Sequence, residues 1–191
     1  MAVDPAVSAD EYETQFATNH VGHALLVKLL LSIMESTARR SGDVRIINLT
    51  SIAYEQAPKM GIDFATLRSS QEKLGGMIPG GKSSRYGQSK LAQMLYTQEV
   101  AKHHPEVTSV SVHPRFIMTG LLGNVDLMTK LPVLLISIGK RTPVKQGHFN
   151  QCWAATCKKS DLRSGEYYEP LGVIGERRTK QAKDQKLAEE L

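Results

Sequence analysis

Apolar positions recur along the chain first at helical and then at strand spacing. From Phe16 to Met34 they follow a helical period and become nearly continuous, which predicts a helix buried on more than one face. The segment Ser8–Glu11 has the spacing of a capping box, so the helix is predicted to begin there. Gly42 is well placed to end it.

The remaining pattern alternates short β-branched runs with amphipathic segments. Val44–Thr50 is typical of an interior strand of a parallel sheet, and residues 52–84 are rich in glycine and proline, which predicts an irregular excursion with one short helix near 64–74. A helix is then predicted over Tyr86–Lys102 and a strand over Val107–Val112. After the apolar run Leu131–Ile138, the pattern predicts a helix over Pro143–Thr156, which begins at a proline, and a last short strand over Gly165–Pro170.

This alternation of helix and strand predicts an α/β fold with a doubly wound parallel sheet. Only about three strands are present, and such a narrow sheet leaves an edge and a helix face uncovered. No internal repeat supplies the missing cover. We therefore expect an incomplete sheet that needs further structure beside it.

Length and charge refine this picture. A chain of 191 residues with 41% hydrophobic content suits one domain, which we expect over residues 1–175, followed by a charged, solvated tail at 176–191. The net charge of +5 is concentrated partly in that tail, and no aromatic residues alternate with basic ones, which argues against nucleic-acid binding.

Three further classes are not expected from the sequence. The first nine residues lack the apolar core of a signal peptide, and the longest apolar runs are too short to span a bilayer. Cys152 and Cys157 lie on one predicted helix, which favours reduced thiols and, weakly, a cytoplasmic location. No metal site is expected, because no carboxylate or cysteine stands at ligand spacing from the histidines His20, His23, His103, His104 and His113.

Candidate chemistry centres on Tyr86 and Lys90, which lie one turn apart on the same helix face. A phenol has a pKa of about 10, and a neighbouring ammonium stabilises the phenolate, so Tyr86 could act as a general acid or base. Ser51 follows a strand at the sheet edge where open α/β folds bind ligands. The alternatives are a chance pair on a helix and a simple turn serine.

Four motifs then occur in the order and spacing of one known family: Thr18–His23, Arg45–Ser51, Tyr86–Ala92, and Val112–Pro114 with Thr119. The chain resembles the short-chain dehydrogenases/reductases up to about Leu171, and is most similar to the retinol-dehydrogenase-like and fungal branch, in which a long insertion precedes the tyrosine helix. The resemblance implies a Rossmann-like fold.

The resemblance also implies roles for the site residues. Tyr86 would exchange a proton with the substrate, Ser51 would hold the substrate oxygen, and Lys90 would lower the tyrosine pKa and contact the nicotinamide ribose. Asn19 would support a water that relays protons to Lys90. Tyr86, Lys90, Ile117 and Thr119 would contact the cofactor, NADP or NAD.

The chain departs from the family pattern in two places. The family's glycine-rich cofactor turn does not precede the matched motifs, so an N-terminally truncated member is expected. The pairs Gly75–Gly76 and Gly80–Gly81 are poor substitutes for that turn, because they lie in the excursion, neither after a strand nor before a regular helix. Arg115 stands where the family usually has a glycine that lets the backbone approach the nicotinamide; its side chain either obstructs the cofactor or points into solvent.

Two functions therefore stay open. One is an oxidoreductase that reduces a ketone or oxidises a secondary alcohol of a lipophilic or secondary-metabolite substrate. The other is a catalytically impaired chain, either a vestigial product or a binding partner that forms a homo-oligomer or pairs with a full-length relative. The family's dimer interface, formed by helices that match Asp10–Met34 and Tyr86–Lys102, would serve the second.

Overall fold

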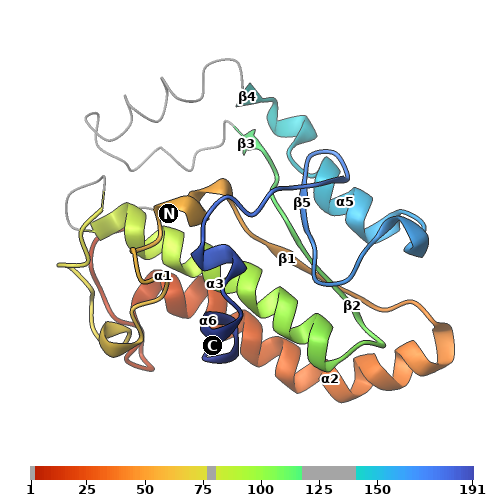
Figure 1. Cartoon of the computed structure of the whole chain (residues 1–191), viewed down its shortest axis with the longest axis horizontal. Helices are drawn as coiled ribbons and strands as arrows, with labels where there is room; N and C mark the ends of the chain where they lie inside the picture. Colours follow the sequence, from red (N-terminus) through yellow and green to blue (C-terminus); the bar gives the residue numbers. More distant parts are fainter. Residues whose placement is uncertain (1–2, 77–80, 118–140) are drawn as a thin grey trace.

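The chain forms an α/β fold with helices on both faces of a small sheet (Figure 1). The computed structural model describes residues 3–76, 81–117 and 141–191. The sheet has the order β1-β2-β5-β6. The strands are β1 (Arg45–Leu49), β2 (Thr108–Val112) and β5 (Tyr167–Glu169), which are parallel, and β6 (Val173–Ile174), which is antiparallel to β5.

The predicted parallel α/β sheet is thus confirmed, with a fourth, antiparallel strand that the pattern did not predict. A separate two-stranded pair, β3 (Phe116–Ile117) and β4 (Arg141–Thr142), lies beyond β2. The predicted apolar run Leu131–Ile138 lies outside the described residues.

Strand β1 was expected in the interior of the sheet, but within the described part of the chain it pairs with β2 alone and forms the edge. The Val44 carbonyl and the Thr50 amide bond to β2. Because groups alternate in direction along a strand, the backbone groups of Arg45, Ile47 and Leu49 point outward. The expectation was wrong because a β-branched run indicates only that both faces of a strand are buried, and helices do cover both faces of β1. Such a run does not indicate that both edges of the strand are paired.

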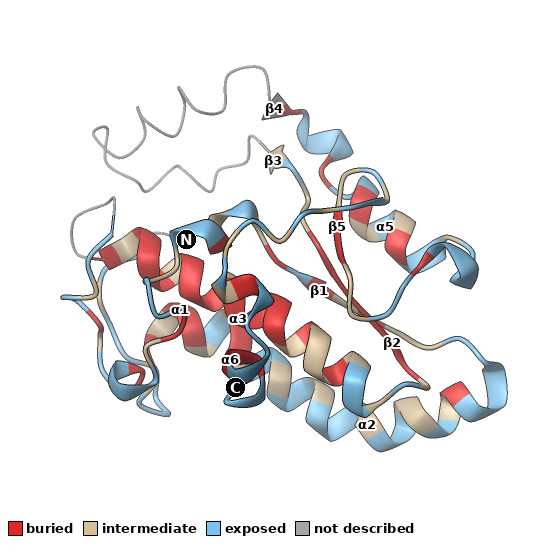
Figure 2. Cartoon of the chain, viewed as in Figure 1, coloured by how far each residue is buried: buried red, intermediate tan, exposed pale blue. Residues whose placement is uncertain are grey.

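Each face of the sheet carries its own apolar cluster. Ile46 and Val107 pack with Ala38 of α2 (Gly22–Ser41) and Val100 of α3 (Lys82–His103). The opposite face carries α5 (Phe149–Thr156), where Val110, Val112, Ala154, Leu162 and Tyr168 form a second cluster. The helix α3 was predicted over Tyr86–Lys102 and is longer at both ends. It lies at the centre of the molecule, and much of it is buried (Figure 2).

The first helix begins later than its predicted capping box. Glu11 has a φ of 61° and Ser8 Oγ accepts a hydrogen bond from the Tyr12 amide, so this segment forms a turn. The helix starts at α1 (Thr14–Phe16), capped by the Glu13 carboxylate. It continues through a π-helical turn, η1 (Ala17–Val21), into α2, which ends at Gly42 in the left-handed conformation, as predicted.

One face of α2 carries exposed leucines. Leu25, Leu29 and Ile33 follow one another at four-residue spacing, with Leu26 and Leu30 beside them, and Leu29 and Ile33 are 68% and 63% exposed. The opposite face packs on α3. The prediction that this helix is buried on more than one face is therefore wrong for the described chain, because no described element covers the second face.

The continuous helix Thr14–Ser41 is long and apolar enough, by length and composition, to cross a membrane, and only 6% of its most apolar stretch is buried. The expectation that no apolar run is long enough to span a bilayer rested on two short runs, residues 25–34 and 131–138. The helix extends the apolar segment in both directions.

The charged C-terminal residues pack against α3 instead of forming a solvated tail (Figure 1). They contain a short 3₁₀ turn, η8 (Gln181–Lys183), and α6 (Gln185–Glu189), whose amides are capped by Asp184. Ala182, Leu187 and Ala188 are buried in the largest apolar cluster. The expectation failed because the charges occupy the outer side of an amphipathic turn and helix.

Two smaller segments also differ from the pattern. In the irregular excursion the described elements are two 3₁₀ turns, η2 (Ile52–Gln56) and η3 (Phe64–Thr66), instead of a helix over 64–74. The segment from Pro143 begins as a 3₁₀ turn, η6 (Val144–Gln146), before α5, and a further turn, η7 (Lys159–Asp161), follows.

Candidate active site

Ser51, Tyr86 and Lys90 are brought together where β1 ends. Ser51 follows β1 and caps the turn η2, its Oγ accepting a hydrogen bond from the Ala53 amide at 3.2 Å. Tyr86 and Lys90 lie on α3, with the Lys90 ammonium 5.8 Å from the centre of the Tyr86 ring. Lys90 Nζ donates to the Leu49 carbonyl at 2.9 Å. The three residues predicted to act together therefore share the carboxyl end of the sheet.

Gly87 allows η2 to approach α3 closely. A Cβ atom at Gly87 would lie 2.6 Å from the Ala53 carbonyl oxygen and 2.7 Å from backbone atoms of Gln56 and Ala57. These contacts are with backbone, which cannot rotate away as a side chain could. The absence of a side chain at this position thus sets the distance between the turn that carries Ser51 and the helix that carries Tyr86.

The electrostatics differ from the expected effect of Lys90 on Tyr86. Burial raises the pKa of Tyr86, and a hydrogen bond with the Ser51 hydroxyl lowers it by less. Burial also lowers the pKa of Lys90 to about 8, so the ammonium is still mostly protonated at neutral pH. The expectation that Lys90 lowers the Tyr86 pKa is not met in this structure, because desolvation of the phenol dominates.

Asn19 lies in the π-helical turn and contacts α3 next to Lys90. Its Nδ2 donates to Ser89 Oγ at 2.9 Å, and Ser89 Oγ donates to the Tyr86 carbonyl. The Asn19 carbonyl accepts from Gln93 Nε2 and lies 2.9 Å from His23 Nδ1. π-Helical turns are rare and often mark functional sites. Asn19 thus ties the first helix to the segment of α3 that carries the candidate residues.

The residues expected near a nicotinamide are only partly described. Ile117 lies on β3, and its side chain occupies the space beside Gly147, where a Cβ would come within 2.4 Å of it. Thr119 lies outside the described residues. Arg115 has a φ of 74°, a conformation that favours glycine, and its exposed guanidinium donates to the Pro170 carbonyl at 3.4 Å. The side chain therefore follows the alternative in which it points into solvent.

Of the excursion's glycine pairs, Gly75, Gly76 and Gly81 lie among the described residues. Contrary to expectation, Gly81 directly precedes a regular helix, α3. However, Lys82 pairs with Asp4 at 2.8 Å, and Gly76 packs against Ser84, since a Cβ there would lie 2.2 Å from the serine Oγ. The described residues fit the nicotinamide end of a cofactor, where Lys90 has N–H groups beyond the one given to Leu49.

A buried ion pair next to Tyr86 was not predicted from the sequence. Arg85 Nε lies 3.2 Å from Glu13 Oε1, and both side chains are fully buried. Arg85 also donates to the carbonyls of Val3 and Gln71, so it joins three segments at the residue before Tyr86. The pairing gave no sequence signal, because it joins residues 72 positions apart.

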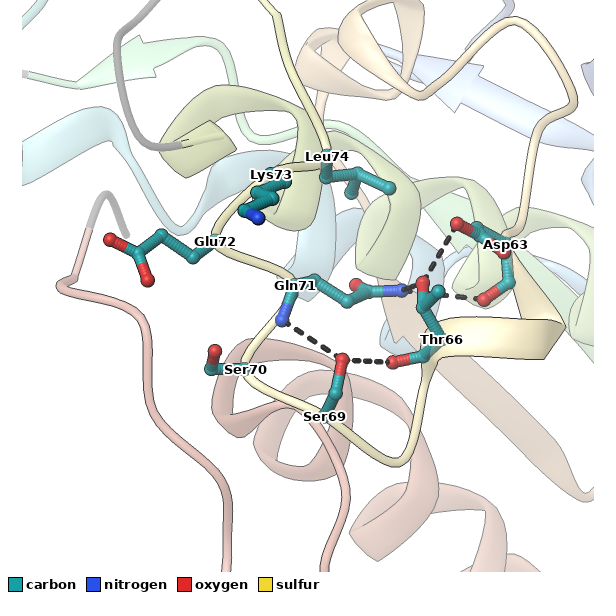
Figure 3. Close-up of a pocket in the computed structure, with 8 residues that line it drawn as sticks. All are labelled: Asp63, Thr66, Ser69, Ser70, Gln71, Glu72, Lys73 and Leu74. Atoms are coloured by element: carbon teal, nitrogen blue, oxygen red, sulfur yellow. Dashed lines mark hydrogen bonds between the residues drawn. The ribbon is translucent and has the colours of Figure 1, made fainter.

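An open hollow of about 360 Å³ lies in the excursion (Figure 3). Its lining residues are Asp63, Thr66 and Ser69–Leu74. The Gln71 side chain points inward, where its Nε2 donates to Thr66 Oγ1 and its Oε1 accepts from Gln88 of α3, while the Gln71 backbone amide donates to Ser69 Oγ. These polar groups hold the loop together and to the helix, and none of the candidate catalytic residues lines the hollow.

In the described part of the chain, no group of three or more potential ligand side chains could hold a metal ion.

Comparisons with curated proteins give relatives of one kind. The chain is 35% identical over 173 residues to the short-chain dehydrogenase TIC 32 A, chloroplastic, of Brassica napus, covering 87% of this chain and 51% of the relative. It is 30% identical to the short-chain dehydrogenase/reductase drtF of Aspergillus calidoustus, covering 98% and 62%, and 31% identical to mouse retinol dehydrogenase 12, covering 84% and 46%. The chain spans about half the length of such relatives. No family model matches it.

Solved structures agree on the fold. A protein from Mycobacterium paratuberculosis superposes with a TM-score of 0.66 at 23% identity, covering 99% of this chain and 59% of that protein. The NADPH-bound carbonyl reductase from chicken fatty liver gives 0.54 at 18% identity, covering 91% and 62%. The solved structures thus share the fold of this chain, and the sequence relatives and the order of the motifs show that the chain is similar to the short-chain dehydrogenases/reductases over most of its length.

Proposed function

We propose that the chain carries the catalytic half of an NAD(P)(H)-dependent oxidoreductase that reduces a ketone or oxidises a secondary alcohol. One observation carries the proposal: Ser51, at the end of β1, and Tyr86 and Lys90, on α3, converge at the carboxyl end of the sheet. A general acid, a hydrogen-bond donor and a cation in one place suit proton exchange at a substrate oxygen.

Each residue has a distinct role in this proposal. In reduction, Tyr86 Oη donates a proton to the carbonyl oxygen as negative charge develops there, and Ser51 Oγ holds that oxygen by a second hydrogen bond. Lys90 supplies positive charge beside the phenol and binds the ribose hydroxyls with its remaining N–H groups. A nicotinamide dinucleotide supplies hydride transfer when it is bound. Asn19, through Ser89, keeps this part of α3 in register with the first helix.

The raised pKa of Tyr86 fits the direction of reduction. A phenol that stays protonated at neutral pH is ready to donate. Oxidation of an alcohol instead requires the phenolate, and a cationic neighbour favours that form. We therefore expect reduction to be favoured at neutral pH and oxidation only at higher pH.

The relatives support the class of reaction more than the substrate. One is named a retinol dehydrogenase and one solved structure a carbonyl reductase with NADPH. By analogy we propose NADP or NAD as cofactor and a lipophilic or secondary-metabolite ketone or alcohol as substrate. The cytoplasmic location remains a proposal that rests on the free thiols of Cys152 and Cys157.

The test is to titrate the purified chain with NADPH and NADH and to assay ketone reduction. Saturable binding is expected, with turnover that falls at least ~100-fold in Tyr86→Phe, since the general acid is removed. Tyr96→Phe, a change of the same kind on the same helix, is the control and should keep its activity. Absence of binding up to millimolar cofactor would refute self-sufficient redox function.

A second candidate function, a binding role within an oligomer, is favoured by the exposed leucines of α2. Burying Leu25, Leu29 and Ile33 against a second helix would remove apolar surface from water at about 25 cal/mol per Å². Leu29→Lys should therefore lower the association state measured by light scattering. Ala155→Lys, which adds the same charge on the exposed surface of α5, on the opposite face of the sheet, is the control. A monomeric wild-type chain would exclude self-association.

A further inference from the structure

The turn that carries Ser51 is held on one side by the C-terminal residues. Tyr54, in η2, is 1% exposed, and its hydroxyl accepts a hydrogen bond from the Arg178 amide at 2.9 Å and donates to the Glu176 carbonyl at 3.3 Å. Burial raises the pKa of Tyr54, so the hydroxyl keeps the proton that it donates. The turn is thereby fixed to the backbone of a segment more than 120 residues away along the chain.

Arg178 adds a bridge from the same segment. Its guanidinium contacts Glu55 of η2 at 3.1 Å and Glu169 of β5 at 2.7 Å. One planar side chain therefore joins the turn after β1 to the end of β5, across the carboxyl edge of the sheet. Each contact is partly exposed, so the bridge constrains geometry more than it adds stability.

The same segment also packs along the residues that follow η2. Gln181 Nε2 donates to the Lys59 carbonyl, and Leu187 of α6 lies so close to Gly61 that a Cβ there would come within 2.4 Å of it. The segment 53–61 thus contacts α3 at Gly87 on one side and Gln181 and Leu187 of the C-terminal segment on the other, while its outer residues stay exposed. Movement of the turn in either direction is opposed by backbone or by a buried side chain.

Ser51 is coupled to Tyr54 by one turn of 3₁₀ helix. The Tyr54 amide donates to the Ser51 carbonyl at 3.0 Å, and the Ala53 amide donates to Ser51 Oγ. Fixing the Tyr54 side chain therefore fixes the direction of the Ser51 hydroxyl. We propose that the C-terminal segment Glu176–Leu191 positions Ser51 against Tyr86, with Tyr54 and Arg178 as positioning residues. Only the change in kcat expected from this inference rests on the proposed function; the expected change at the Tyr86 side chain does not.

The first experiment replaces Tyr54 by phenylalanine, which keeps the ring against Tyr167 and removes both hydrogen bonds. The readout is the Tyr86 ¹³Cζ resonance at pH 7.5, assigned by its loss in Tyr86→Phe. Tyr54→Phe should shift this resonance in the same direction as Ser51→Ala, and the double variant should shift it no further. Tyr96→Phe, which removes a tyrosine hydroxyl elsewhere on α3, should leave it unchanged.

The second experiment uses Arg178→Met with Arg177→Met as its matched control. Arg177 contacts Gly165 and Glu166 and makes no hydrogen bond or ion pair with η2 among the described residues, although the charge change is identical. Arg178→Met should shift the Tyr86 resonance and lower kcat about threefold with little change in KM, and Arg178→Lys should restore part of both. Tyr54→Phe should lower kcat about tenfold, as expected for a misplaced catalytic group.

The outcomes separate this inference from the proposed function. If the wild-type chain shows no turnover, the Tyr86 resonance still decides whether the C-terminal segment positions Ser51. A Tyr86 resonance that is unchanged in Tyr54→Phe, or shifts that add fully in the double variant with Ser51→Ala, would overturn the inference. A fall in thermal stability without a change at Tyr86 would assign these contacts to stability alone and would equally overturn it.

Discussion

Replacing Gly87 by alanine tests the close packing that places Ser51 beside Tyr86. The added Cβ would lie 2.6 Å from the Ala53 carbonyl oxygen, against the 3.4 Å of ordinary contact, so η2 must retreat by about 0.8 Å. A displacement of about 1 Å at a reacting group costs on the order of 100-fold in rate. We therefore expect kcat of an active preparation to fall by one to two orders of magnitude.

The effect on stability is the balance of two terms. Overpacking a tight contact costs about 1–3 kcal/mol, and alanine in a helix interior gains about 1 kcal/mol over glycine, which leaves a net loss of about 0–2 kcal/mol. Gly22→Ala provides the matched control, because its Cβ would meet its nearest atom, the Ala17 carbonyl oxygen, at an ordinary 3.5 Å. The free energy of unfolding of Gly22→Ala should therefore rise by about 1 kcal/mol.

Urea unfolding at 25 °C gives the free energy of unfolding of both variants. The informative quantity is the difference between the two free energies, about 1–3 kcal/mol, since the gain in helix propensity is common to both variants. Equal stabilisation of Gly87→Ala and Gly22→Ala would refute the argument, because it would mean that η2 moves away from α3 without cost.

Three further predictions follow from the backbone and the buried charges. Arg115→Gly should stabilise the chain by about 1 kcal/mol in urea unfolding, because φ of 74° strains a residue with a Cβ and only one long hydrogen bond, to Pro170, is lost. Burial lowers the pKa of His20 to about 4 from an ordinary 6.5, so the unfolded chain binds the extra proton and the stability that His20 contributes, complete above pH 6.5, is lost towards pH 4; His20 should account for about 2 kcal/mol of the loss from pH 7 to 5. His20→Gln should remove this part and leave the loss due to His113, whose pKa burial also lowers to about 4. Glu13→Gln should lower the free energy of unfolding by about 3–5 kcal/mol because it removes the buried carboxylate that pairs with the Arg85 guanidinium, and the further change Arg85→Met should recover part of that loss; full additivity of the two changes would contradict this pairing.

The elements that carry the candidate catalytic residues could be predicted because their signals are local. The helix that carries Tyr86 and Lys90 has a clear apolar period, and the strand before Ser51 is a compact β-branched run. Neither prediction required knowledge of distant contacts. The spacing of Tyr86 and Lys90 on one helix, and the place of Ser51 after a strand, then limited how these side chains can meet.

Long-range contacts explain the errors. The first helix takes its cap from Glu13 instead of Ser8, and Glu13 is also held by Arg85 from the middle of the chain. The charges of the C-terminal residues predict a solvated tail only when the apolar positions between them are left out. The spacing of Ala182, Leu187 and Ala188, with Asp184 as a helix cap, was the available signal.

The outward direction of the Leu49 carbonyl links the open edge of the sheet to Lys90. This carbonyl belongs to the side of β1 that has no strand partner in the described chain, and the Lys90 ammonium satisfies it. A parallel strand added beside β1, from any source, would compete for the same acceptor. Completing the sheet would then free one more N–H group of Lys90 for the site, so that assembly of the fold would also change how this lysine can bind a ligand.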